Sequence, residues 1–183
     1  RRRQRQMCIE TGLYDKIETV TARQLARIQE YLIALKATDD VDTARRLLKH
    51  IVILGTYIKR RSNLVFVCDK AEDIDTTELR LSLFESAESL RLSDIRCAVQ
   101  IADTAKISPA SAVAIYDAFE AIIEATLPGL QEILFCAEHT AQGWGLRCSV
   151  QCTDTPAALP GLPQMQLERD DDGLLYLSLI HIS

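Results

Sequence analysis

The sequence lacks the short motifs by which many proteins bind phosphate groups or metal ions. Its 183 residues contain neither a GxGxxG nor a GxxxxGK[ST] phosphate loop. The six cysteines include no CxxC pair, and the three histidines give no supportable Ser–His–Asp arrangement. No apolar run approaches the ~20 residues that a transmembrane helix needs, and the N-terminal residues are not typical of a signal peptide. We therefore expect no metal site, no membrane span, and core cysteines in a reducing cytosol.

Charge is unevenly distributed along the chain. Residues 1–63 contain fourteen Lys and Arg against seven Asp and Glu, whereas the remainder contains seven against nineteen. This asymmetry favours two modules, one basic and one acidic. The basic half lacks the interleaved aromatic residues that single-strand binders use. A solvated helical face is therefore favoured over nucleic-acid binding.

Two long amphipathic helices are predicted in the basic half. Apolar residues recur at spacings of three, four and seven from Met7 to about Leu35, and again from about Asp42 to Arg61. Residues 37–40 form the turn between them. Because a hairpin of this size cannot bury both apolar faces alone, we expect a homodimer that forms a coiled-coil-like four-helix bundle.

The acidic half reads as alternating strands and helices. Leu64–Val67 is a short apolar run of strand type, Asp75–Leu92 has helical periodicity, and Ile95–Ile101 alternates with period two. Ser108 and Pro109 suit the start of a further helix, because serine caps free amide groups and proline fits the first helical position.

That further helix carries two faces of different character. Its apolar residues share one face, namely Ile115, Phe119, Ile122 and Ile123. Glu120 and Glu124 lie four residues apart on another face. Leu127-Pro128-Gly129 ends the helix, and two strands that reach Cys152 follow. Residues 153–164 are predicted to be a loop and 174–179 a last strand, with Ile180–Ser183 outside the strand pattern.

The sequence thus predicts an α+β fold: a helical dimerisation hairpin over residues 1–62, then a two-layer α/β sandwich with a mixed sheet over 63–183. This order resembles the transmitter region of bacterial sensor histidine kinases, in which a dimerisation and phosphoacceptor hairpin is joined to an ATPase-like sandwich. The resemblance covers nearly the whole chain and rests most on Leu92–Cys152. It implies an upstream sensor segment, a response-regulator-like partner, and a cytoplasmic location or the cytoplasmic part of a membrane-bound sensor.

In that family the first helix presents a phosphoacceptor histidine followed by an acidic residue. Here Tyr14 stands in the histidine position and Asp15 follows it. A tyrosine hydroxyl with a pKa near ~10 is a poor nucleophile at neutral pH. His50, a lone histidine on the second helix, is expected to be a surface or packing residue.

The resemblance implies ATP and Mg²⁺ as cofactors and points to three candidate binding residues. Glu120 matches the glutamate of the family's nucleotide helix, while Glu124 replaces the asparagine that ligates magnesium. A carboxylate can ligate Mg²⁺, but its charge repels a triphosphate. Asp154 matches the aspartate that accepts a hydrogen bond from adenine, yet both glycines of that turn are missing.

These departures favour a pseudokinase or regulatory transmitter with impaired ATP binding and no assigned catalytic residue. Two alternatives stay open at this point. One is an active histidine kinase with an atypical site, and the other is a non-catalytic α/β protein-interaction domain.

Overall fold

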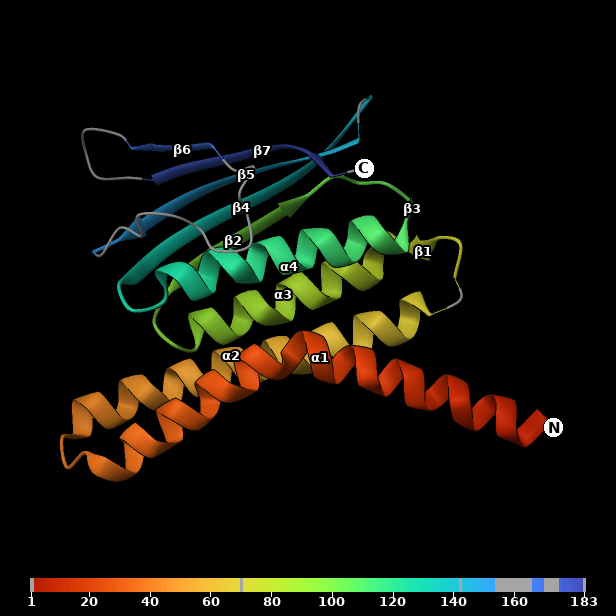
Figure 1. Ribbon diagram of the computed structural model, residues 1–183. Helices are drawn as coiled ribbons and strands as arrows, with labels where there is room; N and C mark the ends of the chain where they lie inside the picture. The colour runs from red at the N-terminus through yellow and green to blue at the C-terminus, as the bar shows by residue number, and fades with distance from the viewer. Residues whose placement is uncertain (1, 70, 142, 154–165, 170–174, 183) are drawn as a thin grey trace.

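The structure is a computed structural model that describes residues 2–69, 71–141, 143–153, 166–169 and 175–182. The helices are α1 (Arg2–Ala37), α2 (Val41–Cys68), α3 (Thr76–Arg91) and α4 (Pro109–Thr126). The strands are β1 (Ile74–Asp75), β2 (Arg96–Ile101), β3 (Lys106–Ile107), β4 (Leu130–Thr140), β5 (Gly143–Cys152), β6 (Gln166–Arg169) and β7 (Leu175–Ile182). The α+β fold class predicted from the sequence is confirmed, with a helical hairpin followed by a two-layer sandwich (Figure 1).

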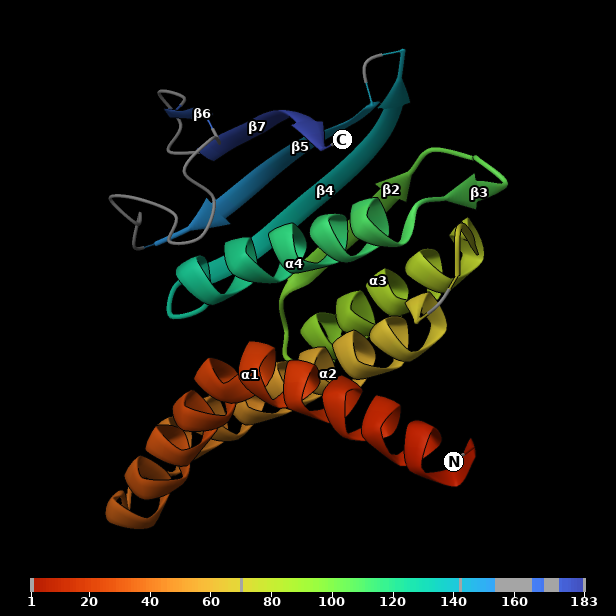
Figure 2. The same cartoon turned by 45° about the vertical axis from the view of Figure 1, so that its right-hand side comes forward.

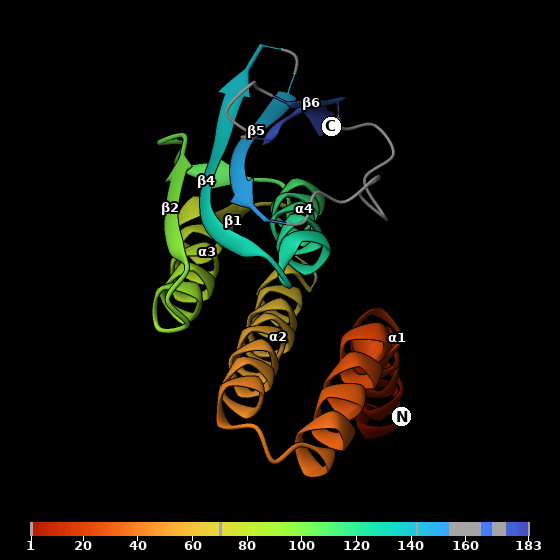
Figure 3. The same cartoon turned by 90° about the vertical axis from the view of Figure 1, so that its left-hand side faces the viewer.

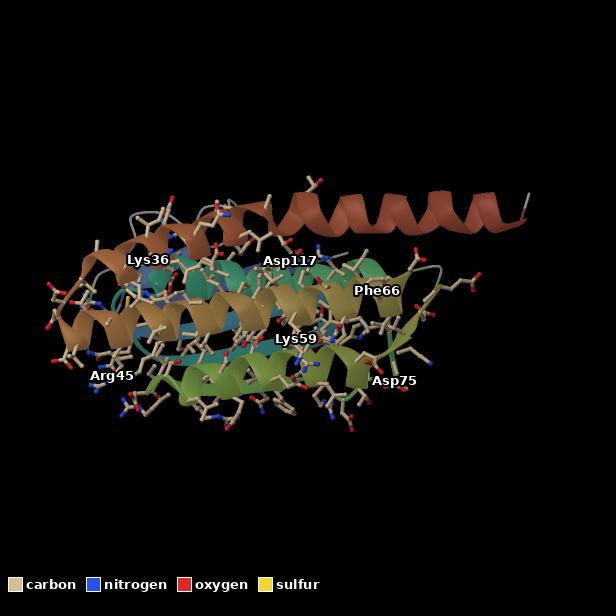
Figure 4. All side chains as sticks on the ribbon, turned by 90° about the horizontal axis from the view of Figure 1, so that it is seen from below. Lys36, Arg45, Lys59, Phe66, Asp75 and Asp117 are labelled. Atoms are coloured by element: carbon tan, nitrogen blue, oxygen red, sulfur yellow. The ribbon has the colours of Figure 1, made fainter. Side chains whose placement is uncertain are left out.

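The predicted hairpin is formed by α1 and α2, which lie against each other and are joined by residues 38–40. The Asp40 side chain accepts a hydrogen bond from the Thr43 backbone amide at 2.8 Å and so caps α2. Viewed from below, α2 lies between α1 and α3 (Figure 4). The N-terminal part of α1 projects beyond the rest of the molecule (Figures 1 and 2).

The predicted strand at Leu64–Val67 is wrong, because α2 continues through this segment to Cys68. Leu64 lies seven residues after Tyr57, on the same buried face of the helix, and is 1% exposed. Phe66 and Val67 point outward and are exposed. A short apolar run of this kind has no periodicity that separates strand from helix. The expected boundary between residues 62 and 63 therefore falls inside a continuous helix.

The main sheet has five strands in the order β2-β4-β5-β7-β6. Strand β2 pairs with β4 in parallel and the other neighbours are antiparallel, so the sheet is mixed, as predicted. Strand β6 and the small β1–β3 pair were not predicted. The expectation that the strand pattern ends at Leu179 is also wrong, because β7 pairs with β5 as far as Ile182.

Helices α3 and α4 cover one face of the sheet (Figures 1 and 3). The apolar face predicted for α4 is confirmed, since Ile115, Phe119, Ile122 and Ile123 are all fully buried. The Phe119 ring meets the Phe135 ring of β4 edge to face, with centroids 5.0 Å apart. The helix starts as expected, because the Ser108 hydroxyl accepts from the Ser111 amide at 3.1 Å.

Helix α2 belongs to the core of the sandwich as well as to the hairpin. Its buried residue Arg61 makes two hydrogen bonds to Asp117 of α4, from Nε to Oδ1 at 2.6 Å and from a terminal nitrogen to Oδ2 at 3.1 Å. The Tyr57 hydroxyl also donates to Asp117 Oδ1, at 3.1 Å. The Tyr57 ring stacks on Tyr116, whose hydroxyl is hydrogen-bonded to Ser86 of α3 at 2.8 Å. These contacts tie α2 to both helices of the sandwich.

Replacing Arg61 with Met is expected to lower the free energy of unfolding by about 1–3 kcal/mol, because the Asp117 carboxylate then lies partly buried without its cation. Urea denaturation measures the loss. The matched control is Arg96→Met, which breaks the pair between Arg96 and Glu132 on the exposed surface of the sheet. That change should cost no more than about 1 kcal/mol. Equal losses in the two variants would contradict a structural role for the Arg61–Asp117 pair.

Candidate functional site

The two glutamates that the sequence singled out on α4 face the helical hairpin. Glu120 is 2% exposed. It lies close enough to Tyr57 of α2 and to Tyr116 that its charge influences both hydroxyl groups. Glu124 is partly buried one turn further along and forms an ion pair with Arg23 of α1. The hairpin therefore packs over the face of α4 that carries both carboxyl groups.

Burial governs the chemistry of Glu120. It raises the pKa of this carboxyl group well above its ordinary value, and the nearby Glu124 and Asp117 carboxylates raise the pKa further. Its Oε1 atom has no hydrogen-bond partner within the described part of the chain. The shift favours the neutral form of Glu120, and a neutral carboxyl group is a weak ligand for Mg²⁺.

A cavity of about 220 Å³ lies beside Glu124, between the hairpin and α4. Its polar lining comes from Arg23, Arg27 and Tyr31 of α1 together with Glu124, and Leu54 of α2 closes its apolar side. Glu120 does not line this cavity. The space is smaller than the roughly 300–1,000 Å³ typical of pockets for drug-sized ligands.

The structure brings Glu120 and Glu124 together, but it does not join the other candidates to them. Tyr14 and Asp15 lie in the N-terminal part of α1, for which only the backbone is described. Asp154 lies outside the described residues. The roles proposed for these three residues therefore stay predictions.

Sequence reasoning did not predict that Arg61 pairs with Asp117, although both residues had a detectable signal. Within Lys59-Arg60-Arg61, only Arg61 continues the buried helical spacing that includes Tyr57. Asp117 precedes Glu120 by three residues and so shares its face of α4. A cation and a carboxylate on two apolar helix faces are expected to pair, because an unpaired buried charge is costly.

The described residues contain no group of three or more His, Cys, Asp or Glu side chains placed to hold a metal ion. A search of the described helices for a long apolar stretch also found none that could cross a membrane.

No family model matches the chain, and no curated protein matches it. Among solved structures, the chain is similar to the histidine kinase domain of the blue-light activated histidine kinase EL346 from Erythrobacter litoralis, with 13% identity, 88% of this chain and 95% of that chain covered, and a TM-score of 0.50. A bacterial phosphotransferase is 9% identical, with 94% of this chain and 96% of that chain covered and a TM-score of 0.49. The histidine kinase ThkA, solved with the response regulator TrrA, is 13% identical to this chain. The match covers 97% of this chain and 63% of that chain, with a TM-score of 0.39.

The likeness to the Erythrobacter domain shows the fold. The chain shares the fold of that histidine kinase domain, with a helical hairpin that precedes a two-layer α/β sandwich. The resemblance inferred from the order of elements is confirmed at this level. At 13% identity the likeness does not extend to activity.

Glu120→Gln is expected to make the stability of the protein less dependent on pH. Since the pKa of Glu120 is raised in the folded state, the unfolded chain releases this proton first as pH rises above about 4.5. The wild-type protein therefore loses free energy of unfolding with rising pH, by up to about 1.4 kcal/mol per pH unit, until the folded pKa is passed. Glutamine, which does not ionise, removes this loss.

Urea denaturation of both proteins between about pH 5 and about pH 8 measures the difference. The free energy of unfolding of the variant, relative to that of the wild type, should increase as pH rises. Glu132→Gln, on the exposed surface of the sheet, is the control and should follow the wild type. Parallel curves for Glu120→Gln and the wild type would contradict a buried, neutral Glu120.

Proposed function

We propose that the chain is a signalling transmitter with the histidine kinase fold that has lost ATP binding, and thus a pseudokinase. The observation that carries this proposal is the burial of Glu120 at 2% exposure beneath the hairpin. A carboxyl group that is neutral and covered offers neither a base nor a metal ligand to a nucleotide.

The state of Glu124 supports the same proposal. In the histidine kinase family an amide occupies this position, whereas the Glu124 carboxylate is already paired with Arg23. A nucleotide at this face of α4 would have to break that ion pair and displace α1. The binding energy available for a ligand is reduced by the cost of such a rearrangement.

The expected result is that MgATP neither stabilises nor labels the protein. A ligand at a hundred times its Kd stabilises a protein by about 2.7 kcal/mol, so binding would raise Tm by several degrees. We expect no change in Tm with MgATP and no transfer of labelled phosphate. Glu124→Asn restores the family's amide and is expected to stay inactive, because Glu120 remains covered.

Two outcomes of this experiment argue against the proposal. A concentration-dependent rise in Tm together with labelling of the wild type would favour an active kinase with an atypical site. If Glu124→Asn binds ATP and the wild type does not, the lost ATP binding of the wild type is due to charge repulsion by Glu124 and not to the hairpin that covers α4.

We further propose that residues 1–62 act as the dimerisation element of this transmitter. Leu25 and Leu32 lie seven residues apart on α1, and Leu48 and Val52 lie four apart on α2, so each pair shares a face of its helix. All four side chains are 41–52% exposed. A second copy of the hairpin that packs on these residues would remove them from water and complete a four-helix bundle.

In this proposal the conformation of the hairpin controls how the sandwich of residues 63–183 binds a response-regulator-like partner. An upstream sensor segment supplies the input through α1. Tyr14 and Asp15, in the phosphoacceptor position, take no phosphate. The competing role, a docking module outside signalling, predicts that a partner binds the sandwich regardless of the state of the hairpin.

Sedimentation equilibrium is expected to give the mass of a dimer at high micromolar concentration. Replacing both Leu32 and Val52 with Glu should give a folded monomer, because burial of four charges in the dimer is unfavourable. Leu134→Glu, at an exposed apolar position on the sheet, should leave the dimer intact. A monomeric wild type would contradict the dimerisation proposal and leave the ATP result unaffected.

A further inference from the structure

A second cavity, of about 230 Å³, shares Leu127 with the first as a lining residue. It is enclosed by the N-terminal half of α2, the turn between α3 and β2, and the turn between α4 and β4. Its polar lining comes from α2 and from Ser93, and the α2 residues are the Asp42 carboxylate, Arg45, Arg46, Lys49 and His50. Figure 4 labels Arg45 near the N-terminal end of α2.

Positive charge in this cavity is only partly neutralised. Arg45 pairs with Asp42 at 3.1 Å, and Lys49 pairs with Asp94. Arg46 contacts the Thr43 hydroxyl at 3.5 Å and is near enough to the Asp40 carboxylate to lower its pKa, but it forms no ion pair among the described residues. Like charges this close on one helix repel one another, whereas the positive end of the α2 dipole is already capped by Asp40. The arrangement is therefore suited to an anion.

His50 adds a second hydrogen-bonding group to the same wall. Its ring packs against Tyr31 of α1 with centroids 5.3 Å apart. Burial lowers the pKa of His50, and Arg46 and Arg27 lower it further. A neutral imidazole retains one N–H donor for an oxyanion, and its partial burial weakens competition from water.

The floor of the cavity is apolar. Ile53 of α2, Ile95 before β2 and Leu130 of β4 line it and are each at most 8% exposed. An inorganic ion would leave this floor uncovered, whereas a compact organic group on the anion would bury it. The volume is below the roughly 300–1,000 Å³ of pockets for drug-sized ligands, which disfavours a nucleoside triphosphate.

We propose that this cavity, lined by Arg46, His50, Lys49 and the apolar floor, binds a phosphate monoester of a small organic group. Arg46 supplies a cation that is not held in an ion pair and a planar set of donors that matches phosphate oxygens. His50 supplies a further donor, and Ile53, Ile95 and Leu130 contact the organic group. Because α2, the turn between α3 and β2, and β4 all contribute, the ligand connects the hairpin to the sandwich.

Phenyl phosphate is a suitable probe, since it combines one phosphate with one compact apolar group. NMR of the histidine ring protons reports binding directly, because the chain contains only three histidines and His50→Gln assigns the signal. We expect a saturable shift of the His50 signal with phenyl phosphate. Phenol, which lacks the phosphate, and inorganic phosphate, which lacks the ring, should each bind at least about tenfold more weakly.

Arg46→Gln is expected to weaken phenyl phosphate binding by about tenfold or more, while Arg46→Lys retains part of the affinity. Arg96→Gln should leave it unchanged, because Arg96 does not line the cavity and its exposed side chain pairs with Glu132 on the sheet. Absence of a saturable His50 shift would overturn the proposal. Equal affinity for phenol and phenyl phosphate, or for the wild type and Arg46→Gln, would do so as well.

These outcomes are independent of the test for ATP binding. If MgATP were to raise the Tm of the wild type, Arg46→Gln would show whether its phosphates occupy this cavity. A rise that survives Arg46→Gln belongs to the face of α4 that carries Glu120.

Discussion

The structure depends on one helix, α2, which packs in the hairpin and in the core of the sandwich. Helix α2 packs against α1 as half of a hairpin and against α3 and α4 as part of the sandwich core. Its buried face carries Arg61, which would be costly there without the Asp117 carboxylate that receives it. Tyr57 donates to the same carboxylate. The pair therefore fixes the rotation of α2 about its own axis, because a turn of the helix in either direction would leave a partly buried charge unpaired.

The orientation of α2 also determines which face of α4 is covered by the hairpin. The face of α4 next to Asp117 carries Glu120 and Glu124, and both lie under the hairpin once α2 and α1 are in place. The loss of hydration raises the pKa of Glu120 and so favours its neutral form, while Arg23 forms an ion pair with Glu124. The same two residues that resemble a nucleotide site are thereby turned into contacts between the hairpin and the sandwich.

Periodicity predicted most of the fold, because one face of each long helix and strand is buried. The apolar spacing of α4 and the alternation in β2 and β5 were enough to place these elements and their core residues. It failed at Leu64–Val67, where four apolar residues fit either a strand or the last turn of a helix, and only packing of Leu64 on the core decides between them. The sequence identified the two glutamates of the candidate site, but it did not predict that the hairpin packs over them. Glu124 contacts Arg23 of α1, about a hundred positions away in the sequence, and local sequence contains no signal for such a contact.

The continuity of α2 through Cys68 constrains how this molecule can move. A rise of 1.5 Å per residue makes its 28 residues about 42 Å long, and no break in its hydrogen bonding separates the part beside α1 from the part within the core. The hairpin and the sandwich thus lack a joint at the place where the sequence suggested a boundary. Residues 38–40, between α1 and α2, lie outside both helices. A displacement of α1 relative to α2 and the sandwich would therefore turn at these residues and would separate Arg23 from Glu124.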